Sequence, residues 1–274
     1  MSRLEARVRR PAELDAAARD AMYSLFAQHY AATTRARFEA DLAGKDYLIE
    51  LHADGALRGF STLALDDFVA GGRRRRAIFS GDTIIHRDSW GEQALVQAFC
   101  RLAGALHAAD PATPLYWFLI TKGHRTWRYL NAFAHRYHPH PLLAPDALAT
   151  ECIDLLARRR FGAAWQAAQG VVRFARPVGA LRPELAAPRA SLARRPEIRY
   201  FLERNPGHAQ GDELCCLTEL TPANLRGHAR RAFLQGCHDD PRVVPTDRGE
   251  RAPAAQRAGH DARAAAAPAG AHPG

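Results

Sequence analysis

The sequence predicts an α+β fold in which helices pack on a sheet of mixed strand direction. Two helical patterns open the chain before residue 45, a hairpin pattern and a further strand follow, and helix and strand patterns then alternate. We divide the chain into four regions, which are a core at 11–140, an Arg- and Pro-rich excursion, partly helical and partly irregular, at 141–195, C-terminal strands completing the sheet at 196–238, and a disordered tail at 239–274.

The first two predicted elements are amphipathic helices. The second follows a threonine cap at Thr33-Thr34, turns Phe38 and Leu42 inward and stops at Gly44. The first begins near Pro11, and its inward stripe recurs at spacings of three and four, at Met22, Leu25, Phe26 and His29.

A hairpin is predicted next, from strands Tyr47–His52 and Leu57–Leu65 around the turn residues Asp54 and Gly55. Residues 66–76 are expected to form a looser turn, in which the arginines at 73–76 are solvated. A strand then runs from Ala77 to Ile85.

The second half of the core alternates helix and strand. The run PLYWFLI at 114–120 is typical of a strand buried on both faces, and we expect it to lie parallel to the strand at 77–85 because a helix joins the two. A further helix is predicted over His124–Tyr137, and Lys122, His124 and Arg125 at its start are expected to line the same cleft as the site residues below. The connecting helix carries its stripe at Leu95, Phe99, Leu102 and Leu106.

Beyond the core, residues 151–165 are predicted to be helical. Two more strands are expected at Ile198–Leu202 and Glu213–Leu217. The predicted core order is therefore ααβββαβα, with extra C-terminal strands.

Composition narrows the class of protein. The net charge of +9 suggests an acidic partner, but nearly all of it is arginine and no recognition motif accompanies it, so nucleic-acid binding is not expected. Five irregularly spaced cysteines predict reduced thiols and no metal site. The N-terminus lacks an apolar leader and no run is long enough for a membrane span, so we expect a cytoplasmic protein.

Asp82 is a candidate catalytic residue because a carboxylate inside the apolar strand IFSGDTII is unusual. Gly81 before it indicates a β-bulge or a close backbone approach. Asp82 is expected either to deprotonate or bind an amine, or to pair with one of the arginines at 73–76.

The loop after this strand is a candidate phosphate site. A loop that opens a helix directs backbone N–H groups and the positive end of the helix dipole at whatever lies above it. Arg87 adds a possible charged contact, Ser89 a cap and Gly91 room for close approach, while a plain capped turn is the alternative.

In its order of elements and in the position of this loop, the chain resembles the GNAT acyltransferase superfamily. The family loop has Arg or Gln, two residues, Gly, one residue, then Gly or Ala, and here the glycine comes one position later. The resemblance implies that the loop binds the pyrophosphate of acetyl-coenzyme A or another acyl-coenzyme A. The residues carried over are Arg87, Asp88, Ser89, Trp90, Gly91, Glu92 and Gln93.

The resemblance also implies a role for Tyr129, which lies about two turns into the helix after the next strand, close to where the family has a tyrosine. A tyrosine there is the general acid for the departing thiolate, although packing with a solvated hydroxyl explains it equally well. The implied reaction moves an acyl group from coenzyme A, or from an acidic acyl carrier protein that suits a basic surface, to a small-molecule or peptide amine. A non-catalytic binding protein that keeps the fold is the alternative.

Overall fold

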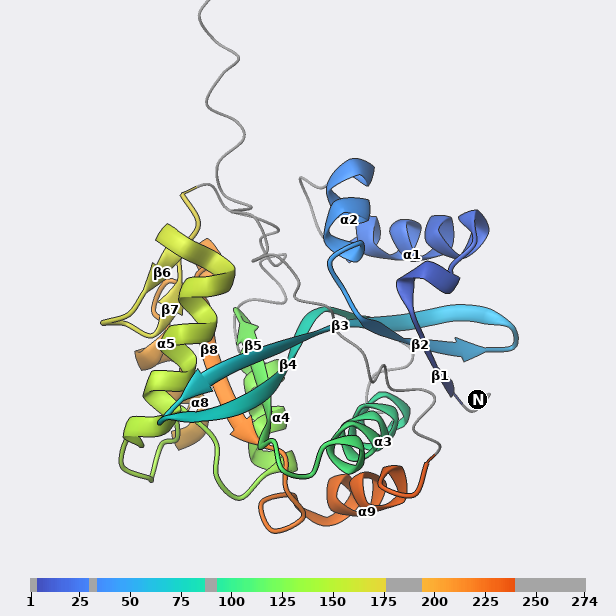
Figure 1. The fold of residues 1–274 in the computed structure, drawn as a ribbon. Helices are drawn as coiled ribbons and strands as arrows, with labels where there is room; N and C mark the ends of the chain where they lie inside the picture. Colours follow the sequence, from blue (N-terminus) through green and yellow to red (C-terminus); the bar gives the residue numbers. More distant parts are fainter. Residues whose placement is uncertain (1–3, 30–33, 87–92, 176–193, 240–274) are drawn as a thin grey trace, which may run out of the picture.

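A computed structural model describes residues 4–29, 34–86, 93–175 and 194–239. Its strands form one sheet in the order β1-β2-β3-β4-β5-β8-β7-β6 (Figure 1). The strands are β1 (Glu5–Arg9), β2 (Tyr47–Ala53), β3 (Ala56–Ala70), β4 (Arg73–Ile85), β5 (Leu115–Thr121), β6 (Trp165–Gln166), β7 (Val171–Val172) and β8 (Glu213–Glu219). The helices are α1 (Ala16–His29), α2 (Arg35–Leu42), α3 (Ala94–Ala109), α4 (His124–Phe133), α5 (Ala147–Phe161), α8 (Pro196–Arg204) and α9 (Gly227–Gly236).

The predicted fold class is confirmed. From α1 to α4 the elements follow the GNAT-like order ααβββαβα. β4 and β5 pair in parallel and the other neighbouring strands are antiparallel, so the sheet is mixed as expected.

Helices cover both faces of the sheet (Figure 1). One face packs against α3, α4, α8 and α9 through the largest apolar cluster. The other face carries two separate apolar clusters, one under α1 and α2 and one under α5. Alternate residues of a strand share a face, so Phe60 in the first of these clusters, Ala64 in the second and Thr62 between them all lie on it. Thr62 therefore marks the seam between the two clusters.

Local signals explain the first half of the chain well. The Thr34 hydroxyl caps α2 by accepting the N–H of Arg37. Asp54 and Gly55 have φ of 51° and 76°, the left-handed values that a tight hairpin turn requires.

The predicted loose turn at 66–76 is wrong, because β3 and β4 continue through it to a turn at Gly71 and Gly72, which have φ of 54° and 68°. The arginines at 73–76 consequently lie in β4 and not in a solvated loop. Arg75 is only 8% exposed and donates hydrogen bonds to the Ala70 carbonyl and the Tyr116 hydroxyl.

The strand predicted at Ile198–Leu202 is also wrong, because these residues lie in α8. Pro196 at the first turn of α8 and the buried residues Ile198 and Phe201, three apart, have a helical period. The strand predicted at Glu213–Leu217 is confirmed as β8. The sequence patterns did not predict β1, β6, β7 or α9, and residues 240–274 of the predicted tail lie outside the described residues.

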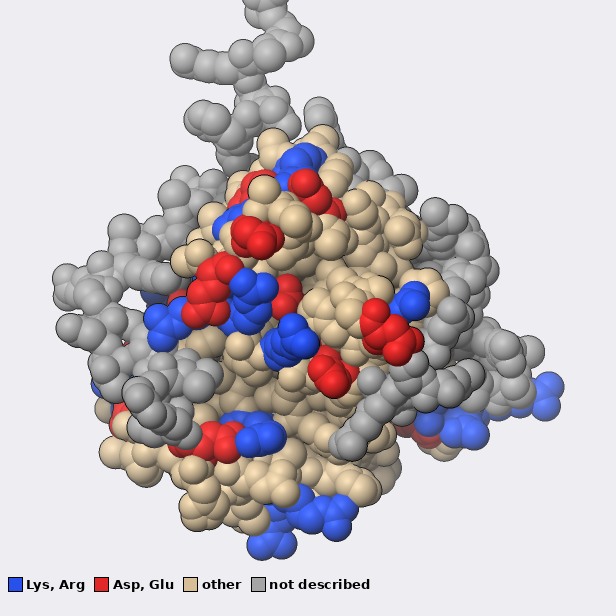
Figure 2. Space-filling view, turned by 90° about the vertical axis from the view of Figure 1, so that its right-hand side faces the viewer, with Lys and Arg blue, Asp and Glu red and all other residues tan. Residues whose placement is uncertain are grey.

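Charge is mixed on the face that carries α1, β1 and the β2–β3 turn. Figure 2 shows lysine and arginine side chains lying beside acidic ones there, without a continuous basic surface. Among the described residues, no helix combines the length and the apolarity that crossing a membrane requires.

Candidate active site

The sheet opens between β4 and β5. The two strands pair from Arg76–Leu115 to Ser80–Leu119, and beyond Ser80 the strand β4 continues to Ile85 with β3 as its partner. The second half of β4 therefore lies beyond the part that pairs with β5, and Asp82 is the acidic residue of that half.

A β-bulge lies at this opening. Ser61 pairs with Thr83 and Leu63 pairs with Ser80, so Gly81 and Asp82 together oppose the single residue Thr62. The bulge that Gly81 indicated in the sequence is therefore confirmed.

Gly81 leaves room for the close approach of Lys45 and Thr62. A side-chain carbon at position 81 would lie 2.7 Å from Lys45 Nζ and 2.8 Å from Thr62 Oγ1. The Thr62 hydroxyl is buried and has no hydrogen-bond partner in the described part of the chain. Glycine thus lets an ammonium group and a hydroxyl approach the strand backbone beside Asp82.

Asp82 belongs to a charged cluster that we define as Asp41, Lys45, Asp82, Lys122 and Glu213. Lys45 Nζ lies 2.8 Å from an Asp41 oxygen, and Lys122 Nζ lies 3.2 Å from a Glu213 oxygen. Asp82 interacts electrostatically with all four. The side chains of Lys45, Lys122 and Glu213 are 6%, 11% and 13% exposed, whereas that of Asp41 is 37% exposed, so the cluster is shielded from bulk water on all but its Asp41 side.

The cluster raises the proton affinity of Asp82. Burial raises its pKa from 3.8 to about 6, the charges of Asp41 and Glu213 add to the rise, and Lys45 and Lys122 oppose it. Burial also raises the pKa of Glu213, against the effect of Lys122. A carboxyl with a pKa near 6 exchanges protons close to neutral pH, as a general base must.

The structure shows that the arginines at 73–76, the alternative partners expected for Asp82, bind other groups. Arg74 and Arg76 both bind the Asp67 carboxylate, and Arg73 binds the Ala112 carbonyl. The cations beside Asp82 are the chain's two lysines. Lys122, which the sequence placed near the site residues, interacts electrostatically with Asp82, whereas no sequence pattern pointed to Lys45 or Glu213.

The other predicted site residues lie apart from this cluster or outside the described part. Tyr129 lies on α4 with a 45% exposed side chain, its ring edge-on to that of Phe133 at 6.4 Å between centroids. No contact found among the described residues joins Tyr129 to Asp82. Gln93 immediately precedes α3 and is exposed, without a side-chain cap hydrogen bond. Arg87, Asp88, Ser89, Trp90, Gly91 and Glu92 lie outside the described residues.

No group of three or more His, Cys, Asp or Glu side chains suited to a metal ion is found where the structure describes the chain. The cysteines at 100, 152, 215 and 216 are buried and Cys237 is partly buried, all as free thiols. The chemical groups that the charged cluster provides are thus carboxyl groups, which can transfer protons, and ammonium groups.

No family model matches the chain, and no curated protein matches it. Solved structures similar to it include an acyl-CoA N-acyltransferase from Pseudomonas aeruginosa, 18% identical with a TM-score of 0.35, covering 47% of this chain and 88% of that one. A GNAT family N-acetyltransferase from Escherichia coli in complex with CoA is 13% identical with a TM-score of 0.34, covering 48% and 69%. A probable N-acyltransferase from Enterococcus faecalis is 14% identical with a TM-score of 0.36, and the match covers 48% of this chain but only 33% of that one.

These likenesses cover about half of the chain at low identity. We therefore base its chemistry on its own side chains.

Proposed function

We propose that the chain is an acyltransferase that moves an acyl group from a thioester, on coenzyme A or an acyl carrier protein, to an amine. The observation that carries the proposal is Asp82 at the opening between β4 and β5, with a pKa of about 6. Near neutral pH this carboxylate is mostly ionised and is basic enough to take a proton from a bound ammonium group.

The proposed reaction moves three protons. Asp82 accepts a proton from the ammonium group, and the free amine attacks the thioester carbonyl. The nitrogen of the tetrahedral intermediate then loses its second proton to solvent, the carbon–sulfur bond breaks as the intermediate collapses, and Tyr129 donates a proton to the departing thiolate. Because Tyr129 is 45% exposed, water can restore its proton.

The charged cluster supports the acceptor half of this proposal. Its three carboxyl groups outnumber its two lysines, so a positively charged amine is attracted to it. Because Lys45 and Lys122 oppose the rise in the pKa of Asp82, they keep the carboxylate available as a base. The Thr62 hydroxyl, buried beside Gly81, offers a further hydrogen bond to a substrate atom.

The donor half of the proposal rests on the resemblance. Residues 87–93 directly precede α3, and the N-terminus of a helix presents backbone N–H groups and a positive dipole end. A pyrophosphate suits such a helix end, and Arg87 would add a charged contact.

Donor binding is tested by thermal unfolding with coenzyme A, acetyl-coenzyme A, longer acyl-coenzyme A and an acylated carrier protein. A donor at a hundredfold excess over its dissociation constant should stabilise the protein by about 2.7 kcal/mol. No stabilisation by any thioester would refute the proposal. Stabilisation without turnover of any amine would instead favour the non-catalytic binding protein.

Catalysis is tested once an amine acceptor is found by screening. Asp82→Asn should lower kcat about a hundredfold and remove the fall in rate below pH 6. Tyr129→Phe should lower kcat by about tenfold to a thousandfold. Unchanged turnover in Tyr129→Phe would leave Tyr129 a packing residue, and an unchanged pH profile in Asp82→Asn would exclude Asp82 as the base.

A further inference from the structure

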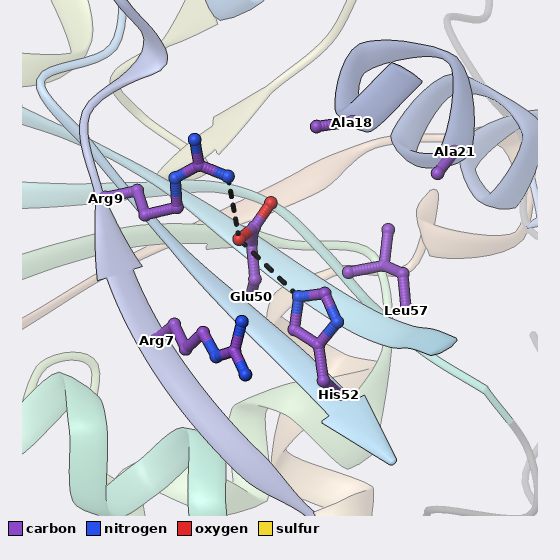
Figure 3. Close-up of a pocket in the computed structure, with 7 residues that line it drawn as sticks. All are labelled: Arg7, Arg9, Ala18, Ala21, Glu50, His52 and Leu57. Carbon is purple, nitrogen blue, oxygen red and sulfur yellow. Dashed lines mark ion pairs between the residues drawn. The ribbon is translucent and has the colours of Figure 1, made fainter. Parts of the chain in front are cut away.

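A second polar site lies at the edge of the sheet, away from the charged cluster. A cavity of about 210 Å³ opens between β1 and α1, above β2 (Figure 3). Polar side chains of β1 and β2 line the cavity on the sheet side, and small apolar side chains line it on the side of α1. The lining residues are Arg7, Arg9, Ala18, Ala21, Glu50, His52 and Leu57.

The polar side chains share one sheet face because of strand register. Arg7 pairs with Glu50 and Arg9 with Leu48, so Arg7, Arg9, Glu50 and His52 all point to the side of the sheet that carries α1. Leu48 on this face is fully buried in the α1–α2 cluster. A strand face beneath a helix is expected to be apolar throughout, so four ionisable side chains there call for a function.

Glu50 is the centre of this site. Its side chain is 3% exposed, and Figure 3 shows its carboxylate between Arg9 and His52. The Glu50 Oε2 atom lies 3.6 Å from Arg9 Nη1 and 3.5 Å from His52 Nε2. At 3.6 Å the Arg9 guanidinium offsets the negative charge of Glu50. Both distances nevertheless exceed the 2.7–3.2 Å of a hydrogen bond. The Glu50 carboxylate can therefore accept a shorter hydrogen bond from a donor that enters the cavity.

The helix side of the cavity explains why space remains. α1 presents Ala18 and Ala21 toward the charged residues, and Leu57 of β3 completes the apolar wall (Figure 3). At the opposite rim, Arg9 is fixed by a hydrogen bond to the Glu13 carbonyl, whereas the side chain of Arg7 is 62% exposed. The cavity therefore combines a buried acid, two guanidinium groups toward its rim and a short apolar wall.

We propose that this cavity binds a small zwitterion of amino-acid size. The ligand's ammonium group donates hydrogen bonds to Glu50, its carboxylate pairs with Arg7 and Arg9, and a short apolar side chain rests on Ala18, Ala21 and Leu57. At about 210 Å³ the cavity is smaller than the roughly 300–1,000 Å³ that drug-sized ligands need. A ligand carrying both charges satisfies Glu50 and the arginines together, which a simple anion or amine does not.

This site is separate from the charged cluster. Glu50 lies opposite Phe60 on β3, and Phe60 lies opposite Ile84 on β4, two residues beyond Asp82. Phe60 and Ile84 are buried in the α1–α2 cluster, so apolar packing divides the two sites. The proposal therefore does not depend on acyl transfer.

The experiment is calorimetric titration of the full chain, without any thioester, with glycine, L-alanine and L-serine. N-acetyl-L-alanine and L-alanine methyl ester serve as matched ligands that each lack one charge. We expect saturable binding of at least one zwitterion, and binding about tenfold weaker or more for both derivatives of alanine, since each loses a charge-assisted hydrogen bond. No saturable binding of any of the three up to about 10 mM would overturn the proposal.

Two variants locate the site. Ala21→Leu fills the cavity and should abolish binding, whereas Ala27→Leu, at an exposed position of the same helix that does not line the cavity, should leave it unchanged. Glu50→Gln should weaken binding about tenfold or more. Far-ultraviolet circular dichroism and the melting temperature show whether each variant is folded. Unchanged binding in a folded Ala21→Leu protein would place the ligand elsewhere and refute the assignment.

Discussion

Replacing Asp82 with asparagine should make the protein more stable at neutral pH while removing its proposed base. The pKa of Asp82 is raised from 3.8 to about 6, first by burial and next by the charge of Asp41. Between these values the folded protein holds a proton that the unfolded chain releases, so the free energy of unfolding falls as the pH rises. This loss begins near the unfolded pKa of 3.8 and is complete above the folded pKa of about 6.

The size of the effect follows from the two pKa values. With 1.36 kcal/mol for each pKa unit, ionising Asp82 costs the folded state about 3 kcal/mol at pH 7.5 and only about 1 kcal/mol at pH 4.5. Asp82→Asn removes this cost because the amide does not ionise. The variant should therefore gain about 2 kcal/mol relative to the unchanged protein between about pH 4.5 and pH 7.5.

The measurement is urea unfolding of both proteins across this pH range, compared as the difference in the free energy of unfolding. Asp67→Asn is a matched control with the opposite sign. Burial raises the pKa of Asp67, but hydrogen bonds and charges from Arg76 and Arg74 outweigh burial and lower it. Asp67→Asn should destabilise the protein at neutral pH, and its effect should shrink as the pH falls through the folded pKa. A pH-independent difference for Asp82→Asn, or one that grows toward acid, would refute the account of the charged cluster.

Three further predictions test the packing, the ion pair and the thiols. Gly104→Ala and Gly236→Ala should each destabilise the protein by about 1–3 kcal/mol in urea unfolding, because an added carbon at either position overlaps a backbone carbonyl of the facing helix where α3 and α9 cross. An effect near zero would mean that the helices lie farther apart. Glu213→Gln should cost about 1–3 kcal/mol because it removes the ion pair between Glu213 and the largely buried Lys122, and the further replacement Lys122→Met should recover much of that loss. Iodoacetamide should label Cys237 in the native protein well before the four buried cysteines, since burial raises the pKa of all five thiols but limits the reagent's access most at the four buried ones, and equal labelling rates would contradict the described burial.

Local periodicity was sufficient to predict most of the core. The stripe on α3 and the apolar run of β5 repeat at the spacings of their element types, and Gly81 inside a strand pattern marked the bulge. Predictions failed where the local signals were misread or fitted more than one element type. Gly71 and Gly72, and not the polar residues before them, form the β3–β4 turn, and α8 was mistaken for a strand because its short apolar pattern fits either period.

The sequence by itself determined the order of the core elements from α1 to α4, the mixed α+β class and the exceptional position of Asp82, because these depend on spacing along the chain. Only the tertiary structure decided which groups surround Asp82. Lys45 and Glu213 come from elements far apart in sequence and meet beside β4, and their charges and the burial they share set its pKa. In the same way, β1 brings Arg7 and Arg9 to Glu50 only because its register against β2 aligns their faces. Strand register and the joint electrostatic field of distant residues depend on how the whole chain packs, so local spacing does not encode them.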